Sequence, residues 1–189
     1  MGLHLSVALL RCCLGWALLE SGELVRAGRE LTLAAEWLAP RSPSESIART
    51  LLALCALAEP AVDEAELHAV RAVERGRDYL PGLAAALGCL ARVKLLRGHS
   101  SEAAHLADEA MACLEADAGV SMTDAFVRRT YIEVHDALGH REAANRQLAI
   151  ASKLLRDRAA RIDEPAWKAS FLAANHQRAI LALAAERDL

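Results

Sequence analysis

One pattern of apolar residues recurs four times along the chain and restricts the possible folds more than any other feature. Each copy has an apolar helix, a short break, and a second helix with apolar, mostly small residues about every four positions. These second-helix positions are Ala27, Leu31 and Ala34; Ala65, Ala69 and Ala72; Ala103, Ala107 and Ala110; and Ala144, Leu148 and Ala151. The first alanine of each copy recurs at steps of 38, 38 and 41 residues. Because one such helix pair cannot bury its apolar face alone, the repeat predicts stacked pairs.

Helix-forming residues dominate the chain, so we expect an all-α fold. Gly (10) and Pro (5) are few among the 189 residues and fall mostly between the periodic segments. The repeats are predicted at 4–40, 43–80, 82–118 and 122–161, followed by a closing helix at 165–187, all within one domain of residues 1–189. Individual helices are predicted at 4–20, 23–38, 43–58, 62–77, 82–97, 100–116, 122–138 and 141–161. Helix-start signals support two of these boundaries, namely Ser42-Pro43-Ser44-Glu45 and Ser121-Met122-Thr123-Asp124.

The order of residues in the first copy resembles the tetratricopeptide repeat. The matching residues are Leu14-Gly15, Leu18, Gly22, Ala27, Leu31, Ala34 and Pro40. The resemblance implies a right-handed α-α superhelix, a solenoid of about four helix pairs. The period is longer than the 34 residues typical of that repeat, and the second copy lacks the glycine between its helices.

The C-terminal third carries a more specific resemblance. Its residues are His135, Ala137-Leu138-Gly139, Ala144, Leu148, Ala151, Leu154-Leu155, Ala159, Ile162-Asp163, Trp167, Ser170-Phe171-Leu172 and Asn175. This region is similar to the C-terminal end of the tetratricopeptide region in large bacterial signalling proteins. Those proteins join a serine/threonine kinase or transcription-regulator domain to an ATPase and a repeat array. The resemblance implies that the segment around Ser170-Phe171-Leu172 closes the solenoid, with Trp167, Phe171 and Leu172 covering the last repeat.

The sequence favours a binding module over an enzyme. It has neither the GxxxxGK[ST] phosphate loop nor a His-Arg-Asp catalytic loop, so kinase and ATPase activities do not carry over. We expect a protein or peptide partner to lie in a groove lined by the first helix of each pair. By helix phase, this groove contains Trp16, Arg92, Arg129 and Glu133, together with Cys12, Thr50 and Leu54. Its two arginines either bind a carboxylate-bearing partner or are ordinary solvated side chains.

Charge, cysteine and histidine usage argue against other classes of function. A net charge of -3 gives no basic field for nucleic acid. Five cysteines without CxxC spacing indicate neither a disulfide framework nor a zinc site, and they fit a reducing cytoplasm. The pairs His135/His140 and His99/His105 lack the i,i+4 ligand spacing, so no metal or cofactor is expected. The apolar stretch up to Leu19 is interrupted by Arg11 and predicts a helix of the domain rather than a membrane span.

Two alternatives to the protein-binding groove remain open. The first helix has an apolar face with Leu5, Leu9, Cys13 and Trp16, which predicts either an upstream repeat or a homo-oligomer formed near Leu9 and Trp16. The scattered His and Cys residues suggest a small-ligand or enzymatic site in a helical cavity, although no catalytic constellation is evident in the sequence.

Overall fold

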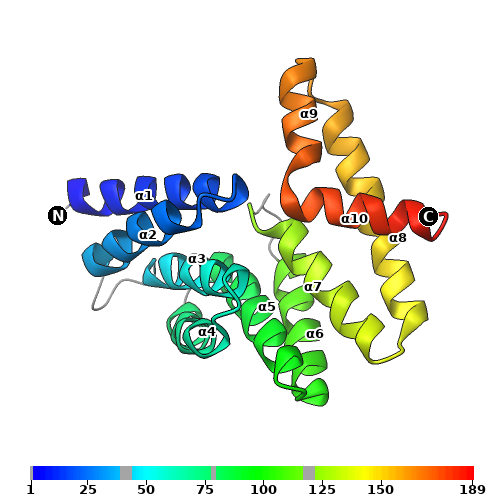
Figure 1. The fold of residues 1–189 in the computed structure, drawn as a ribbon, viewed down its shortest axis with the longest axis horizontal. Coiled ribbons are helices and arrows are strands. Elements are labelled where there is room, and N and C mark those ends of the chain that lie inside the picture. Colours follow the sequence, from blue (N-terminus) through cyan, green and yellow to red (C-terminus); the bar gives the residue numbers. More distant parts are fainter. Residues whose placement is uncertain (1, 39–43, 78–79, 117–121) are drawn as a thin grey trace.

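The computed structural model describes residues 2–38, 44–77, 80–116 and 122–189, and this part of the chain is entirely α-helical. Figure 1 shows the helices arranged in sequence order. They are α1 (Gly2–Glu20), α2 (Leu24–Leu38), α3 (Glu45–Ala58), α4 (Val62–Gly76), α5 (Leu80–Leu96), α6 (Ser100–Ala116), α7 (Asp124–Ala137), α8 (Arg141–Ala160), α9 (Pro165–Ala173) and α10 (Asn175–Glu186). The all-α prediction is confirmed, and each of the first eight predicted helices agrees with an observed one within two residues at both ends. Pro40, Ser42, Pro43 and Ser121, on which the sequence analysis also relied, lie outside the described residues.

Helices that are neighbours in the sequence are neighbours in space. Each of the helices α1 to α8 packs against the next one along the chain. The first helices of successive pairs also contact one another, since α1 packs on α3, α3 on α5, and α5 on α7. The four first helices therefore form a continuous row, and residues on this row from distant parts of the sequence lie close together.

The repeated small residues make up the contact between the helices of each pair. All twelve positions of the pattern are between 0% and 1% exposed. In the first pair, a Cβ atom added to Gly15 would lie 2.5 Å from Cγ and Cδ2 of Leu31, so α1 and α2 approach too closely there for any side chain on α1. The prediction that these residues serve core packing is confirmed.

The same turn joins the two helices in all four pairs. The backbone N–H groups of Glu23, Ala61, His99 and His140 donate to the carbonyl groups of Leu18, Ala56, Lys94 and His135, over 2.8 to 2.9 Å. In the first, third and fourth pairs, a glycine stands just before this turn's end with a φ of 82°, 78° and 77° (Gly22, Gly98 and Gly139). A positive φ favours glycine because it has no Cβ atom. Pro60 takes this place in the second pair.

The predicted closing helix at 165–187 is wrong in one respect, because the structure divides it into α9 and α10. Ala174 interrupts the helix with an extended backbone (ψ 144°). The next backbone N–H, that of Asn175, donates to the carboxylate of Glu20 on α1 over 3.1 Å rather than to a helical carbonyl. Trp167 was expected to cover the last repeat but is 73% exposed. Ile180 and Ala184 of α10 are buried in the apolar cluster with α7 and α8, and Phe171 is partly buried against this cluster.

Two glycine substitutions test whether the turn conformation stabilises the pairs. At both Gly98 in a turn and Gly28 within α2, an added Cβ atom meets nothing within 4 Å, so only backbone conformation distinguishes them. Gly98→Ala should lower the free energy of unfolding by about 1 kcal/mol because its φ is positive. Gly28→Ala should raise it by about 0.5–1 kcal/mol, since alanine is the better helix former. Urea unfolding of both variants measures this, and a Gly98→Ala variant as stable as Gly28→Ala would contradict the turn assignment.

Candidate functional site

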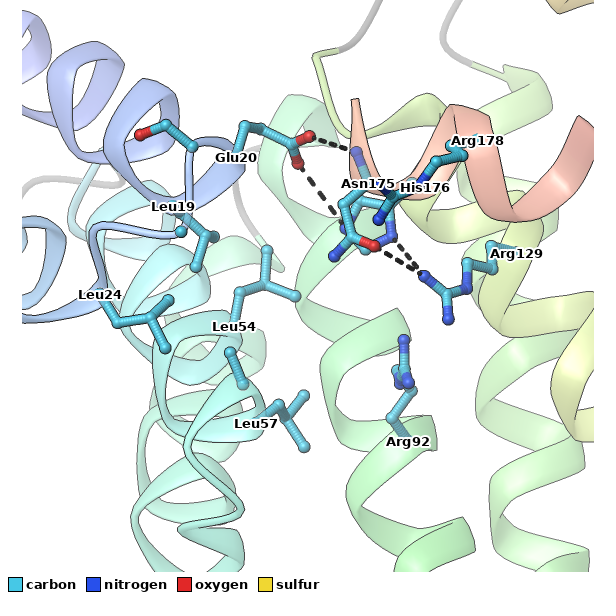
Figure 2. Close-up of a pocket in the computed structure, with 13 residues that line it drawn as sticks. Leu19, Glu20, Leu24, Leu54, Leu57, Arg92, Arg129, Asn175, His176 and Arg178 are labelled. Carbon is cyan, nitrogen blue, oxygen red and sulfur yellow. Dashed lines mark hydrogen bonds and ion pairs between the residues drawn. The ribbon is translucent and has the colours of Figure 1, made fainter. Parts of the chain in front are cut away.

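A cavity of about 460 Å³ opens where the row of first helices meets α2 and α10 (Figure 2). Its lining combines leucines, three arginines and the first residues of α10. The lining residues are Leu19, Glu20, Ser21, Gly22, Leu24, Leu54, Leu57, Ala58, Arg92, Arg129, Asn175, His176 and Arg178. This volume lies within the range of about 300–1,000 Å³ that is typical of ligand sites.

Equivalent positions of the repeat converge on this cavity. Trp16, Leu54, Arg92 and Glu133 each stand eleven residues before the first alanine of their repeat, on α1, α3, α5 and α7. Because these helices pack side by side, their equivalent residues follow one another along the row. Leu54 and Arg92 line the cavity directly. The other two residues adjoin it through side-chain contacts.

Glu133 links the two arginines that the sequence analysis selected. Its Oε1 accepts a hydrogen bond from Nε of Arg129 over 2.6 Å, and its Oε2 lies 3.3 Å from Nη2 of Arg92. The side chains of Arg92, Arg129 and Glu133 are 28%, 23% and 30% exposed. One carboxylate therefore holds both guanidinium groups, which stay partly exposed, and binding of a partner by these arginines stays a prediction. Arg178 adds a third positive charge, so the arginines outnumber the carboxylates of Glu20 and Glu133 by one.

His176, the second residue of α10, connects this cluster to Trp16. Its ring stacks on Trp16 with centroids 6.4 Å apart and meets Phe126 edge-on at 5.3 Å. Its Nδ1 lies 3.5 Å from Nη1 of Arg129, and its Nε2 lies 3.8 Å from Oε1 of Glu20. Burial, together with the nearby positive charges of Arg129 and Arg92, lowers the pKa of His176 to about 3. The imidazole is therefore neutral, and its Nδ1 can accept the hydrogen bond from Arg129.

Glu20 joins the first helix to the last. One oxygen of its carboxylate accepts the backbone N–H of Asn175, at the N-terminus of α10. Burial raises the pKa of Glu20, and the hydrogen bond from Asn175 partly opposes this shift. A carboxylate at a helix N-terminus is a favourable arrangement because it meets unpaired N–H groups and the positive end of the helix dipole.

The structure brings the four predicted site residues together, but two other groove predictions are wrong. Cys12 and Thr50 are only 2% and 3% exposed, so they belong to the core. The helices that carry these residues, α1 and α3, each pack against more than one neighbour. The periodicity of apolar residues alone therefore did not tell which side of each helix faces the core and which faces the groove. Sequence reasoning also missed ten of the thirteen lining residues, among them Glu20, Asn175, His176 and Arg178. No local signal marks these four residues, since only the return of α10 toward α1 places them at the cavity.

A second polar cluster lies at the turn between α7 and α8. Nδ1 of His135 lies 3.2 Å from Nδ1 of His140, and its Nε2 lies 3.0 Å from Oδ1 of Asp108 on α6. The inter-helix turn, rather than helical spacing, brings the two histidines together. Across the described residues no group of three or more His, Cys, Asp or Glu side chains could hold a metal ion. The cluster therefore ties α6 to the α7–α8 turn.

Two thiols, on α1 and α3, are buried, and the serine hydroxyl on the cavity lining is hydrogen-bonded. Burial raises the pKa of Cys12 and of Cys55 to about 11, so neither forms a thiolate readily at neutral pH. Ser21, on the cavity lining, donates its hydroxyl hydrogen bond to the carbonyl of Leu18 over 2.9 Å. Within the ranges that the structure describes, no helix has the length and apolarity needed to cross a membrane.

The buried His176 should make stability dependent on pH. The pKa of His176 is about 3 in the folded state and about 6.5 when unfolded, so only the unfolded state gains a proton as the pH falls below 6.5. The free energy of unfolding should therefore drop by roughly 1 kcal/mol between about pH 7.5 and pH 5.5 through this residue. Glu20, whose pKa is raised, opposes this trend at lower pH.

Urea unfolding at both pH values should show a smaller loss of unfolding free energy for His176→Gln than for wild type. The exposed His105→Gln serves as the control, and equal slopes for wild type and His176→Gln would contradict the assignment.

The comparisons with known proteins assign no family to the chain. No protein-family model matches it, and a search of curated proteins found no match. The function must accordingly be inferred from the residues and their geometry.

Proposed function

We propose that this chain is a non-catalytic protein-interaction module whose cavity binds a segment of a partner protein. The observation that carries the proposal is the convergence of Trp16, Leu54, Arg92 and Glu133, from equivalent positions of four repeats, on one cavity. Repeats that contribute equivalent positions to one surface are typical of binding solenoids. Guanidinium groups held by a shared carboxylate keep further N–H donors for a partner, because each Arg side chain has five.

We further propose that the helix pairs form a tetratricopeptide-like solenoid. The repeated turn and the packing of first helix on first helix support this proposal. The resemblance of the C-terminal third to bacterial signalling proteins suggests the biological setting. In that setting the chain is the C-terminal repeat segment of a cytoplasmic protein that also carries a kinase, ATPase or regulator domain, and it provides the scaffold or sensor function.

Charge reversal in the cavity tests the interaction. Arg92→Glu with Arg129→Glu should reduce capture of a specific partner from the native lysate by about tenfold or more, because truncating one side of a buried charged contact is costly. Arg26→Glu with Arg29→Glu makes the same change of charge on exposed positions of α2 and should leave capture intact. Crosslinked pull-down followed by mass spectrometry measures both variants, after circular dichroism has shown that they are folded. Equal capture by the two double variants, or no specific protein in any sample, would refute the groove as the working site.

Self-association is a second candidate because α1 presents an apolar face to solvent. Leu10 is 67% exposed and Leu14 is 46% exposed, and Cys13 and Ala17 lie exposed on the same side of the helix. The sequence had placed this contact near Leu9 and Trp16. Both of these residues are partly buried, and Trp16 packs against the core and His176. If α1 forms an interface, it uses the side that contains Leu10 and Leu14.

Mass measurement at several concentrations tests this second candidate. Light scattering should show a mass that rises with concentration for the wild type and stays monomeric for Leu10→Asp with Leu14→Asp, since burying the two new carboxylates in an interface is unfavourable. Val25 is 83% exposed and Leu67 is 51% exposed, so Val25→Asp with Leu67→Asp is the matched control that should still associate. A wild-type protein that remains monomeric at all concentrations would rule out this interface.

A further inference from the structure

The cavity has two walls of different chemistry. Leucines from α1, α2 and α3 form one wall, and arginines from α5, α7 and α10 form the other (Figure 2). The apolar wall consists of Leu19, Leu24, Leu54 and Leu57, and the cationic wall consists of Arg92, Arg129 and Arg178. A ligand that filled this space would therefore contact aliphatic carbon on one side and guanidinium donors on the other.

The cationic wall is only partly neutralised within the protein. Arg92 and Arg129 share the single carboxylate of Glu133. No carboxylate among the described residues pairs with Arg178, which is exposed in the first turn of α10. Glu20 is engaged by the N-terminus of α10 and by His176. His176, held neutral by burial, adds no charge of its own. The site is thus short of one negative charge, and Arg178 is the residue best placed to receive it.

We propose that the cavity binds a peptide segment in which an Asp or Glu side chain stands beside an aliphatic side chain. The carboxylate would meet Arg178 and the remaining donors of Arg92 and Arg129, since guanidinium groups bind carboxylates through paired hydrogen bonds. The aliphatic side chain would lie against the leucine wall. A cavity of about 460 Å³ suits a few side chains of an extended segment rather than a whole helix. This inference rests on the proposed function, because it specifies the partner chemistry of the same cavity.

Labelled peptides can separate the contributions of the two walls. The probe is a short fluorescein-labelled peptide of alternating Glu and Leu, compared with Gln–Leu and Glu–Ser peptides of the same length. Fluorescence anisotropy with the full chain should show the tightest binding for the Glu–Leu peptide. Equal affinity for the Gln–Leu peptide would show that charge is not recognised, and equal affinity for the Glu–Ser peptide would show that the apolar wall is not used. Either result would overturn the proposal.

Single substitutions then assign the binding to this cavity. Arg178→Gln should weaken Glu–Leu binding by about tenfold, which is the usual effect of removing one charge-assisted contact. Leu24→Asn should weaken it as well, because Leu24 lines the cavity and belongs to no core cluster. The matched controls are Arg29→Gln and Val25→Asn, which are exposed positions outside the cavity and should bind as wild type does. Equal losses in a variant and its control would overturn the assignment.

Two further outcomes distinguish this inference from the proposed function. If no peptide binds but the Arg92→Glu, Arg129→Glu variant still loses its native partner, the interaction module stands and the ligand assignment falls. If neither experiment shows an effect of the cavity residues, both fall. Octanoate, a small aliphatic carboxylate, is added as a competitor. If octanoate alone binds more tightly than the Glu–Leu peptide, the occupant is a small amphipathic acid and the peptide proposal is overturned.

Discussion

Close packing between the two helices of each pair is the interaction on which the rest of the structure depends. Alanine, leucine and glycine at the contact let the two helices pack closely, as where the Leu31 side chain fills the space beside Gly15. Such contacts gain dispersion energy and bury apolar surface without polar atoms that need partners. Four similar pairs joined by one type of turn then place their first helices in a row. The cavity follows from this row, because equivalent residues of successive repeats come next to one another.

The return of α10 to α1 completes the cavity beside the row of first helices. The interruption at Ala174 redirects the chain, and the carboxylate of Glu20 satisfies the first N–H of the new helix. His176 is then buried between Trp16 and Phe126, in contact with Arg129. The contact that closes the site therefore joins residues 155 positions apart in the sequence.

The cavity carries a local excess of positive charge although the whole chain is slightly acidic. The whole chain carries a net charge of -3, yet the cavity gathers three arginines against two carboxylates. Partial burial reduces the screening of Arg92 and Arg129 by solvent, whereas the unpaired Arg178 is exposed. The leucine wall adds apolar contact to this attraction. Recognition by the leucine wall and the arginines together would require an apolar side chain and a carboxylate in the same partner segment.

The sequence by itself determined the first eight helices, their approximate boundaries and the residues that pack between them. These features depend on local propensity, on turn glycines such as Gly98 and on a periodicity that is visible without coordinates. Helix phase also placed Trp16, Arg92, Arg129 and Glu133 on one side of the first helices, while their role in binding stays a prediction. Only the tertiary structure decided that the last helix breaks at Ala174, that Cys12 and Thr50 are core, and that Arg178 reaches the cavity. Local helix propensity does not predict the break at Ala174, because the contact that stabilises it is made with the carboxylate of Glu20, far away in the sequence.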